Sequence, residues 1–286
     1  MKEIGFVGIG VMGKSMAQNL LNYGYTVHIY TRTKKKADSL IQSGAIWHDN
    51  PAKLAEVVEL LITMVGYPTD VEELYLSEGG FLETMRKGTV AVDMTTSSPE
   101  LAKAIYSEGK AAEIDVLDAP VSGGDIGAKN GTLSIMIGGD RKVFEHVREV
   151  FEVLGENIVF QGEAGSGQHT KMVNQIAIAS NMIGVTEAIV YAEKAGLDPE
   201  KVLQSISSGA AGSWSLSNLI PRVLKDDFSP GFFIKHFIKD MRIALDEAAK
   251  MKLELPGLEL AEKMYQTLAD HGLSDEGTQA LIKYYQ

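Results

Sequence analysis

The sequence of 286 residues contains no cysteine. Disulfides, thiolate-bound metals and thiol nucleophiles are therefore excluded together. Basic residues are outnumbered, with 27 Lys and Arg against 38 Asp and Glu, and the net charge of −11 argues against a general nucleic-acid-binding surface. No run of 18 or more apolar residues occurs, so we expect no membrane span, and the chain enters a predicted strand directly. The expected location is the cytoplasm.

The composition is that of an ordinary soluble globular protein. Apolar residues make up 45% of the chain and charged residues 23%. A domain commonly holds about 150 residues, so the length predicts two domains.

A glycine-rich loop follows the first apolar run. It reads Gly8-Ile9-Gly10-Val11-Met12-Gly13, and an apolar-periodic helical segment continues from it. The order strand, turn, helix is the setting that a dinucleotide fingerprint requires. Gly8 would allow the sharp turn, Gly10 the approach of a pyrophosphate, and Gly13 close packing of helix on strand. The loop predicts a bound dinucleotide, and a glycine-rich turn without a ligand is the alternative.

The segment after the second predicted strand, residues 26–30, lacks an acidic residue. In NAD-binding folds an Asp or Glu about 20 residues after the glycines bonds the ribose 2′-hydroxyl. Here the chain has Thr31-Arg32-Thr33 and then three lysines. The Arg32 guanidinium can bind a 2′-phosphate, and the threonines add hydroxyl donors. The pattern favours binding of NADP(H), with NAD(H) possible. A solvated basic helix start without a ligand is the alternative.

Alternating strands and helices continue to about residue 162. Val65 ends a predicted buried strand at residues 58–65, and Thr96 follows another at residues 89–92. Ligands of open α/β sheets bind at the carboxyl ends of strands. Ser122-Gly123-Gly124 follows a further short strand, and its backbone N–H groups and hydroxyl can hold a carboxylate. From this stretch alone, a simple turn is equally compatible.

The second half of the sequence is helical. A pattern of some 28 residues runs to Ala195, and later turns are expected at 209–212, 228–231 and 256–257. We predict an α/β Rossmann-type N-terminal domain at residues 1–162 and an all-α C-terminal domain at 163–286, with a long interdomain helix. That helix would measure about 42 Å, too long for a small domain to cover, so we expect a homo-dimer or homo-tetramer.

Two lysines are candidates for chemistry. Lys171 and Asn174 lie one turn apart on the long helix among apolar residues, and desolvation lowers the pKa of a lysine toward proton-transfer use. Taken alone, a single helical lysine is usually solvated. Lys239-Asp240 follows an apolar segment, and these residues fit two exposed neighbours equally well.

Five motifs in order resemble the β-hydroxyacid dehydrogenase family, which includes 3-hydroxyisobutyrate dehydrogenase, tartronate semialdehyde reductase and glyoxylate/succinic semialdehyde reductases. The resemblance covers nearly the whole chain. The motifs are Gly8-x-Gly10-x-Met12-Gly13, Asp93-x-Thr95-Thr96, the segment Asp118–Gly124, Gly165-x-Gly167-x-x-x-Lys171-x-x-Asn174, and Lys239-Asp240.

The resemblance implies a role for each matched position. Lys171 would be the catalytic general acid/base, and Asn174 would orient the substrate or Lys171. Ser122, Gly123 and Gly124 would hold the substrate carboxylate. Lys239 would lie by the nicotinamide and the substrate, with Asp240 supporting it.

The resemblance also implies cofactor contacts by residues 8–13, Val65 and Thr96. Its members that use NADPH carry Asn-Arg-Thr after the second strand, and this chain departs only at Thr31, leaving Arg32 and Thr33 in place. The expected activity is hydride transfer between NADP(H) and a small 2- or 3-hydroxy acid or carboxylate semialdehyde.

No metal is implied, because the six histidines show no i, i+4 pairing and no carboxylate cluster has ligand spacing. Three alternatives stay open. Imine reductases share this architecture but commonly lack the lysine. The 6-phosphogluconate dehydrogenases are longer than this chain. A non-catalytic NADP(H)-binding scaffold would have no use for Ser122, Lys171, Asn174 and Lys239. Side-chain selectivity would rest on pocket residues such as Asp125, Ser213, Trp214 and Phe232.

Overall fold

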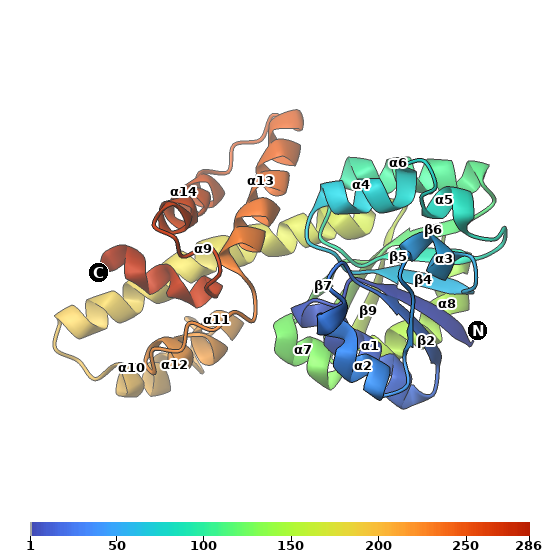
Figure 1. The fold of residues 1–286 in the computed structure, drawn as a ribbon. Helices are drawn as coiled ribbons and strands as arrows, with labels where there is room; N and C mark the ends of the chain where they lie inside the picture. Colours follow the sequence, from blue (N-terminus) through green and yellow to red (C-terminus); the bar gives the residue numbers. More distant parts are fainter. Residues whose placement is uncertain (1) are drawn as a thin grey trace. The chain divides into compact units, whose positions relative to one another are not determined.

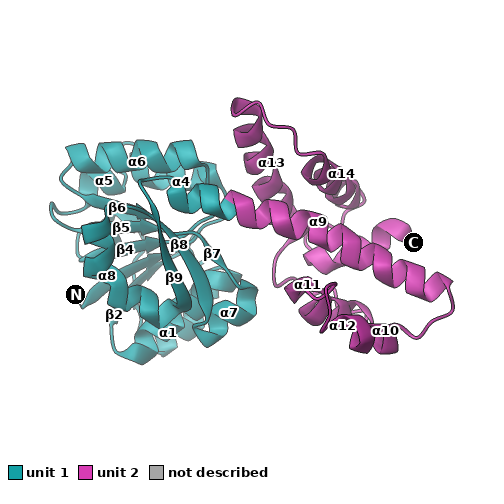
Figure 2. Ribbon diagram, turned by 180° about the vertical axis from the view of Figure 1, so that it is seen from behind, with its two compact units in different colours: residues 1–171 teal, residues 172–286 magenta. Residues whose placement is uncertain are grey.

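The computed structural model describes residues 2–286 and divides into two compact units, Met1–Lys171 and Met172–Gln286. Figure 2 distinguishes them by colour. The last strand of the first unit is β9 (Gly155–Gly162). Helix α9 (Ser166–Lys194) begins in the first unit and continues into the second.

The first unit alternates strands and helices, as the sequence predicts (Figure 1). Its first six strands are β1 (Glu3–Val7), β2 (Thr26–Tyr30), β3 (Ile46–Trp47), β4 (Leu60–Thr63), β5 (Val90–Asp93) and β6 (Asp115–Asp118). The remaining strands besides β9 are β7 (Val121–Ser122) and β8 (Leu133–Gly139).

The strand order is β3-β2-β1-β4-β5-β6-β8-β7, with β9 on β8. Strands β1 to β6 pair in parallel, whereas β8 runs antiparallel to β6 and β7. The first six strands therefore have the order of a dinucleotide-binding sheet, whose direction of growth reverses between β1 and β4. Ligands of such sheets bind outside the carboxyl ends of the strands at this switch point.

Helices cover both faces of the sheet (Figure 1). One apolar core lies between the sheet and a layer that includes α1 (Val11–Tyr23) and α8 (Arg141–Leu154). A second core lies under α4 (Pro68–Leu76) and α6 (Pro99–Ala111). The other helical segments of this unit are η1 (Lys34–Ala37), α2 (Asp38–Gln42), α3 (Pro51–Ala55), α5 (Phe81–Thr84) and α7 (Gly124–Asn130). The Rossmann-type fold is confirmed.

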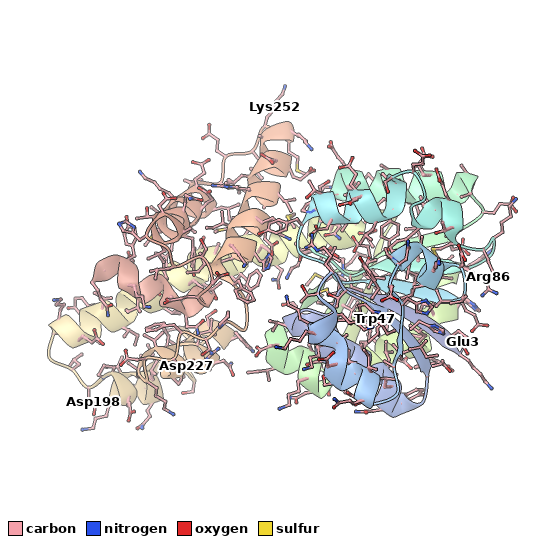
Figure 3. The ribbon with its side chains drawn as sticks, in the orientation of Figure 1. Glu3, Trp47, Arg86, Asp198, Asp227 and Lys252 are labelled. Carbon is pink, nitrogen blue, oxygen red and sulfur yellow. The ribbon has the colours of Figure 1, made fainter. Side chains whose placement is uncertain are left out.

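The second unit is helical, also as predicted. Besides the rest of α9 it contains α10 (Pro199–Ile206), α11 (Trp214–Asn218), α12 (Ile220–Val223), α13 (Ile234–Lys250), α14 (Pro256–Asp270) and η2 (Thr278–Tyr285). Its core joins α9, α13 and α14 through side chains such as Met182, Phe237 and Tyr265. Asp198, labelled in Figure 3, caps α10 by accepting from the N–H groups of Glu200 and Lys201.

One predicted turn is wrong. Pro256 and Gly257 were expected to form a turn, but they are the first residues of α14. Proline is compatible with a first helical position, because its missing N–H has no intrahelical acceptor there. The Cβ of any residue replacing Gly257 would lie 2.9 Å from the Ser180 hydroxyl oxygen, so glycine lets α14 approach α9.

Helix α9 combines length with apolar character. By these properties alone it is the one helix within residues 2–286 that could cross a membrane, a test that core helices of soluble proteins also pass. Its most apolar window is 39% buried. Val173 and Tyr191 on this helix are 66% and 74% exposed.

Candidate active site

The glycine loop has the geometry that a pyrophosphate requires. Gly8 adopts a φ of +105°, and its N–H donates to the Tyr30 carbonyl at 2.9 Å. A Cβ on Gly13 would lie 2.0 Å from the Gly8 carbonyl oxygen, so only glycine allows α1 to approach the strand so closely. A Cβ on Gly10 would meet no atom within 4 Å, and the first turn of α1 has no acidic side chain. The loop therefore leaves its helix N-terminus open to an anion.

Buried polar side chains join the carboxyl ends of β4 and β5. Asp93 Oδ1 accepts from Thr63 Oγ1 at 2.8 Å and from the Thr95 N–H at 3.1 Å. Thr95 Oγ1 in turn accepts from the Val65 N–H at 3.0 Å. These bonds fix the two loops on which Val65 and Thr96 stand.

The start of α9 is attached to the same edge of the sheet. Asp118, the last residue of β6, accepts from the N–H groups of Gly165 and Gln168 at 2.8 and 2.9 Å. The fully buried Gln168 side chain accepts from the Ser97 N–H at 2.9 Å and donates to the Thr95 carbonyl at 2.7 Å. A carboxylate at a helix N-terminus satisfies otherwise unpaired donors and complements the helix dipole. We call Thr63, Asp93, Thr95, Asp118 and Gln168 the strand-end network.

Both carboxyl groups of this network are held in a buried setting. Burial raises the pKa of Asp93 to about 6, although hydrogen bonds from Thr63 and Thr95 oppose the shift. Burial also raises the pKa of Asp118, against the lowering effect of the N–H groups at the start of α9.

Lys171 is buried beside the predicted carboxylate-binding segment. It is 7% exposed, and its Nζ donates to the Val121 carbonyl at 2.8 Å. Gly167 makes this close approach of α9 possible, because a Cβ there would lie 2.4 Å from the Met136 carbonyl oxygen. A single lysine on a helix is usually solvated, but the buried Lys171 side chain excludes that interpretation here. The strand-end network and the Lys171 bond together hold the Nζ next to residue 122.

Ser122, Gly123 and Gly124 do not form an isolated turn. Ser122 belongs to β7 and pairs with Ser134 of β8, and α7 begins at Gly124. Gly123 and Gly124 have φ values of +134° and +63°, so both favour glycine. The segment thus turns from a strand edge directly into a helix N-terminus.

Thr31, Arg32 and Thr33 follow β2, next to the strand that leads to the glycine loop. Arg32 makes an ion pair that the sequence does not predict, with its Nη1 3.0 Å from Asp70 Oδ1. Asp70 Oδ2 accepts from the Tyr67 N–H at the start of α4. The Arg32 side chain is 77% exposed and that of Asp70 16%, so the guanidinium retains access to solvent.

The remaining predicted site residues lie together in the second unit. Lys239 Nζ lies 2.8 Å from Asp240 Oδ1, with the two side chains 11% and 2% exposed, so they are not the exposed neighbours that were one reading. Gln175 Nε2 donates to Asp240 Oδ2 at 2.5 Å, and Asn174 Nδ2 donates to Gln175 Oε1 at 2.8 Å. We call Asn174, Gln175, Lys239 and Asp240 the helix-pair network. Burial, and then the charge of Lys239, lower the pKa of the adjacent His236.

The four predicted pocket residues have different surroundings. Ser213 caps α11 by accepting from the Leu216 N–H, whereas Trp214 is 54% exposed. Phe232 is partly buried, with its ring 5.4 Å from that of Phe237, and Asp125 lies in the first turn of α7. Sequence reasoning gave no role to Gln168, Gln175 or Asp70, although the first lies inside the Gly165–Lys171 motif. Within residues 2–286, no group of three or more His, Cys, Asp or Glu side chains is placed to hold a metal ion.

Two family models together cover nearly the whole chain. The one described as the NAD binding domain of 6-phosphogluconate dehydrogenase matches residues 3–162. The one described as NAD-binding of NADP-dependent 3-hydroxyisobutyrate dehydrogenase matches residues 165–285. The chain belongs to the 3-hydroxyisobutyrate dehydrogenase family. The expected class, an NAD(P)-dependent oxidoreductase with a pyridine-nucleotide-binding domain, is confirmed.

Two relatives and one solved structure resemble the chain over nearly its full length. It is 58% identical over 284 residues to the uncharacterized oxidoreductase YkwC of Bacillus subtilis, covering 99% of each chain. It is 40% identical over 281 residues to the 2-hydroxy-3-oxopropionate reductase of Escherichia coli, covering 98% of this chain and 96% of that one. The structure of Psf3 in complex with NADP+ and 2-OPP is 25% identical, with a TM-score of 0.92 over 99% of this chain and 100% of that one.

Proposed function

We propose that this family member prefers NADP(H) and interconverts a small 2- or 3-hydroxy acid and its aldehyde or semialdehyde, with Lys171 as the general acid/base. The observation that carries the proposal is the buried Lys171, whose Nζ donates to the Val121 carbonyl at 2.8 Å. Val121 directly precedes Ser122 in the chain. The names of the E. coli reductase and of the NADP+ complex support the substrate and cofactor classes.

The first unit fits a dinucleotide. Gly10 leaves space that a Cβ would fill, and the loops holding Val65 and Thr96 stand at the carboxyl ends of β4 and β5. We propose that residues 8–13 hold the pyrophosphate at the α1 N-terminus and that Arg32, with Thr31 and Thr33, binds the 2′-phosphate. When bound, the nicotinamide supplies the hydride in reduction and accepts it in oxidation.

The side chains of the protein handle the proton and the substrate. Lys171 Nζ donates the proton that the substrate oxygen gains in reduction and removes it in oxidation. The hydroxyl of Ser122 and the N–H groups of Gly123 and Gly124 bind the substrate carboxylate. Asn174 orients the substrate, and the Lys239 ammonium, held by Asp240, adds a positive charge beside it.

We also propose that the chain forms a homo-dimer or homo-tetramer. Two large side chains of α9, Val173 and Tyr191, are mostly exposed in the single chain. Exposed apolar surface on a long helix is commonly covered by another subunit. Sedimentation velocity at several protein concentrations tests this proposal, and a monomer at all of them would contradict it.

The test of function is a substrate panel measured with both cofactors. Purified protein is assayed with glyoxylate, tartronate semialdehyde, succinic semialdehyde and 3-hydroxyisobutyrate, each with the phosphorylated and the unphosphorylated nucleotide. We expect turnover of at least one substrate and a kcat/KM at least about 10-fold higher with NADP(H), which corresponds to about 1.4 kcal/mol. Absence of turnover, or equal use of both nucleotides, would contradict the respective half of the proposal.

The imine reductase alternative is tested in the same preparation. A ketone with ammonia and NADPH is assayed for amine formation by mass spectrometry. Amine formation without carboxylate aldehyde reduction would favour that alternative, whereas the buried Lys171 favours alcohol chemistry. Binding of NADPH without turnover of any of these compounds would indicate a non-catalytic scaffold.

A further inference from the structure

The helix-pair network runs between α9 and α13 through side-chain amides. Gln175 is fully buried and Asp240 is 1% exposed. Gln175 stands at its centre, because it donates to Asp240 at 2.5 Å and accepts from Asn174 at 2.8 Å. Neighbouring residues of a helix point about 100° apart, so the bond to Asn174 requires the longer Gln175 side chain to bend back toward it.

The Asp240 carboxylate determines which groups of Gln175 and Asn174 act as donors and which as acceptors. The Asp240 carboxylate, paired with the Lys239 ammonium at 2.8 Å, only accepts hydrogen bonds. Gln175 must therefore turn its NH2 group toward Asp240 and its Oε1 toward Asn174. A flipped Gln175 amide would place two acceptors 2.5 Å apart in a buried setting. Asn174 consequently turns its Nδ2 toward Gln175 and its Oδ1 away from it.

We propose that Gln175 is a positioning residue that makes Asn174 present its carbonyl oxygen, a hydrogen-bond acceptor, to the substrate. The inference rests on the proposed function, in which Asn174 orients the substrate. An acceptor at this position recognises a hydroxyl donor, so it favours substrates whose carbon next to the reacting centre, or the reacting centre itself, carries a hydroxyl group. Asp240 thereby influences substrate selectivity through Gln175, without itself contacting the substrate.

Exchanging the two groups of the central bond tests the inference. Gln175→Glu removes the donor and places a carboxylate against Asp240, and Asp240→Asn removes the acceptor. We expect each single variant to lower kcat/KM for the hydroxy acid about 10-fold or more, with the dissociation constant of NADPH changed less than about 2-fold.

The double variant Gln175→Glu/Asp240→Asn restores the polarity. The new Asn amide donates to the new Glu and its oxygen faces the Lys239 ammonium, while the Glu carboxylate still accepts from Asn174 Nδ2. The charge of the network is unchanged. We expect kcat/KM of the double variant to return to within about 3-fold of the wild-type value. A double variant no more active than the singles would overturn the inference.

Gln279→Glu is the matched control. Gln279 is 1% exposed in the same unit, and its Nε2 donates to the carbonyls of Asp227 and Ser229, outside the network. It should lower the urea midpoint as Gln175→Glu does while leaving kcat/KM within about 2-fold of wild type. An equal loss of activity in Gln279→Glu would assign the effect to buried charge in general and overturn the inference.

Urea unfolding of the wild type, the two single variants and the double variant separates this inference from the proposed function. Non-additive unfolding free energies at positions 175 and 240 report the central bond without any substrate. Additive values would overturn the inference whatever the activities are. If the bond is present but the wild-type enzyme turns over no member of the substrate panel, the proposed function fails and the role in selectivity fails with it. If the wild type is active and the double variant is not, only the inference fails.

Discussion

The two buried polar networks are built from different partners. In the strand-end network, side chains bond largely to backbone groups, as Gln168 does to the N–H of Ser97 and the carbonyl of Thr95. In the helix-pair network, side chains bond to other side chains, as Gln175 does to Asn174 and Asp240. The strand-end network is buried throughout, whereas in the helix-pair network Gln175 and Asp240 are buried and Asn174 and Lys239 are partly buried.

This difference determines what each network can control. Backbone partners cannot be exchanged by substitution, so the strand-end network fixes where the loops and the start of α9 lie. Side-chain partners can be exchanged by substitution, so the donor and acceptor pattern of the helix-pair network depends on the identity of its residues. We infer that the first network supports the reaction common to the family and that the second adjusts the choice of substrate.

The largest predicted effect concerns Lys171, which the strand-end network holds in place. Lys171→Met removes the proton donor while keeping an apolar stem of similar length. General acid/base catalysis contributes about 10² to 10⁴-fold, so kcat should fall about 1,000-fold, and the dissociation constant of NADPH should stay within about 2-fold. Stopped-flow absorbance at 340 nm and fluorescence titration measure the two quantities.

Lys194→Met is the control for this variant, since Lys194 is exposed near the end of the same helix. It should retain full activity. Substantial turnover by Lys171→Met would contradict the assignment of the proton to Lys171. It would also contradict the inference that the strand-end network supports the reaction.

The second prediction concerns the carboxyl group of Asp93. Its folded-state pKa is about 6, raised from 3.8, so the folded protein binds this proton more tightly than the unfolded chain. The associated stability is fully present below about pH 3.8 and is lost as the pH rises through about 6. Between pH 4.5 and 7.5 the wild type should lose about 2 kcal/mol that Asp93→Asn does not lose.

Urea unfolding of the two proteins at both pH values measures this difference. The Asn oxygen can still accept from Thr63 and Thr95, so the variant keeps the hydrogen bonds. Asp115→Asn, which changes an exposed carboxylate at the start of β6, should follow the pH dependence of the wild type. A constant stability gap between Asp93→Asn and the wild type would show that burial does not raise the pKa of Asp93.

Features that depend on local spacing could be predicted from the sequence. The glycine loop, the strand ends at Val65 and Thr96, and the helix carrying Lys171 follow from short patterns and from the rule that parallel strands end at one edge. The resemblance to the family supplied the roles. The strand predicted at residues 26–30 is observed at those residues as β2.

Features that depend on distant pairing could not be predicted. Gln175 and Asp240 lie 65 residues apart, and their pairing depends on how two separate helices pack. Pro256-Gly257 has the composition of a turn, but proline is equally compatible with a first helical position, and Gly257 packs against Ser180 of α9. The Arg32–Asp70 pair joins residues 38 apart, one in the loop after β2 and one in the first turn of α4, so the charge pattern near residue 32 did not reveal it.

The smallest predicted effect concerns the Arg32–Asp70 pair, whose guanidinium is exposed, unlike the ammonium of the Lys239–Asp240 pair. An exposed ion pair contributes about 0–1 kcal/mol, so little is lost when Arg32 turns from Asp70 to a phosphate. Arg32→Ala should raise KM for NADPH about 10-fold and KM for NADH less than about 2-fold. Asp70→Asn keeps an acceptor for the Tyr67 N–H and should change either KM less than about 3-fold. Steady-state kinetics with both nucleotides measure these values, and an equal effect of Arg32→Ala on both would remove the argument for NADP(H) from this position.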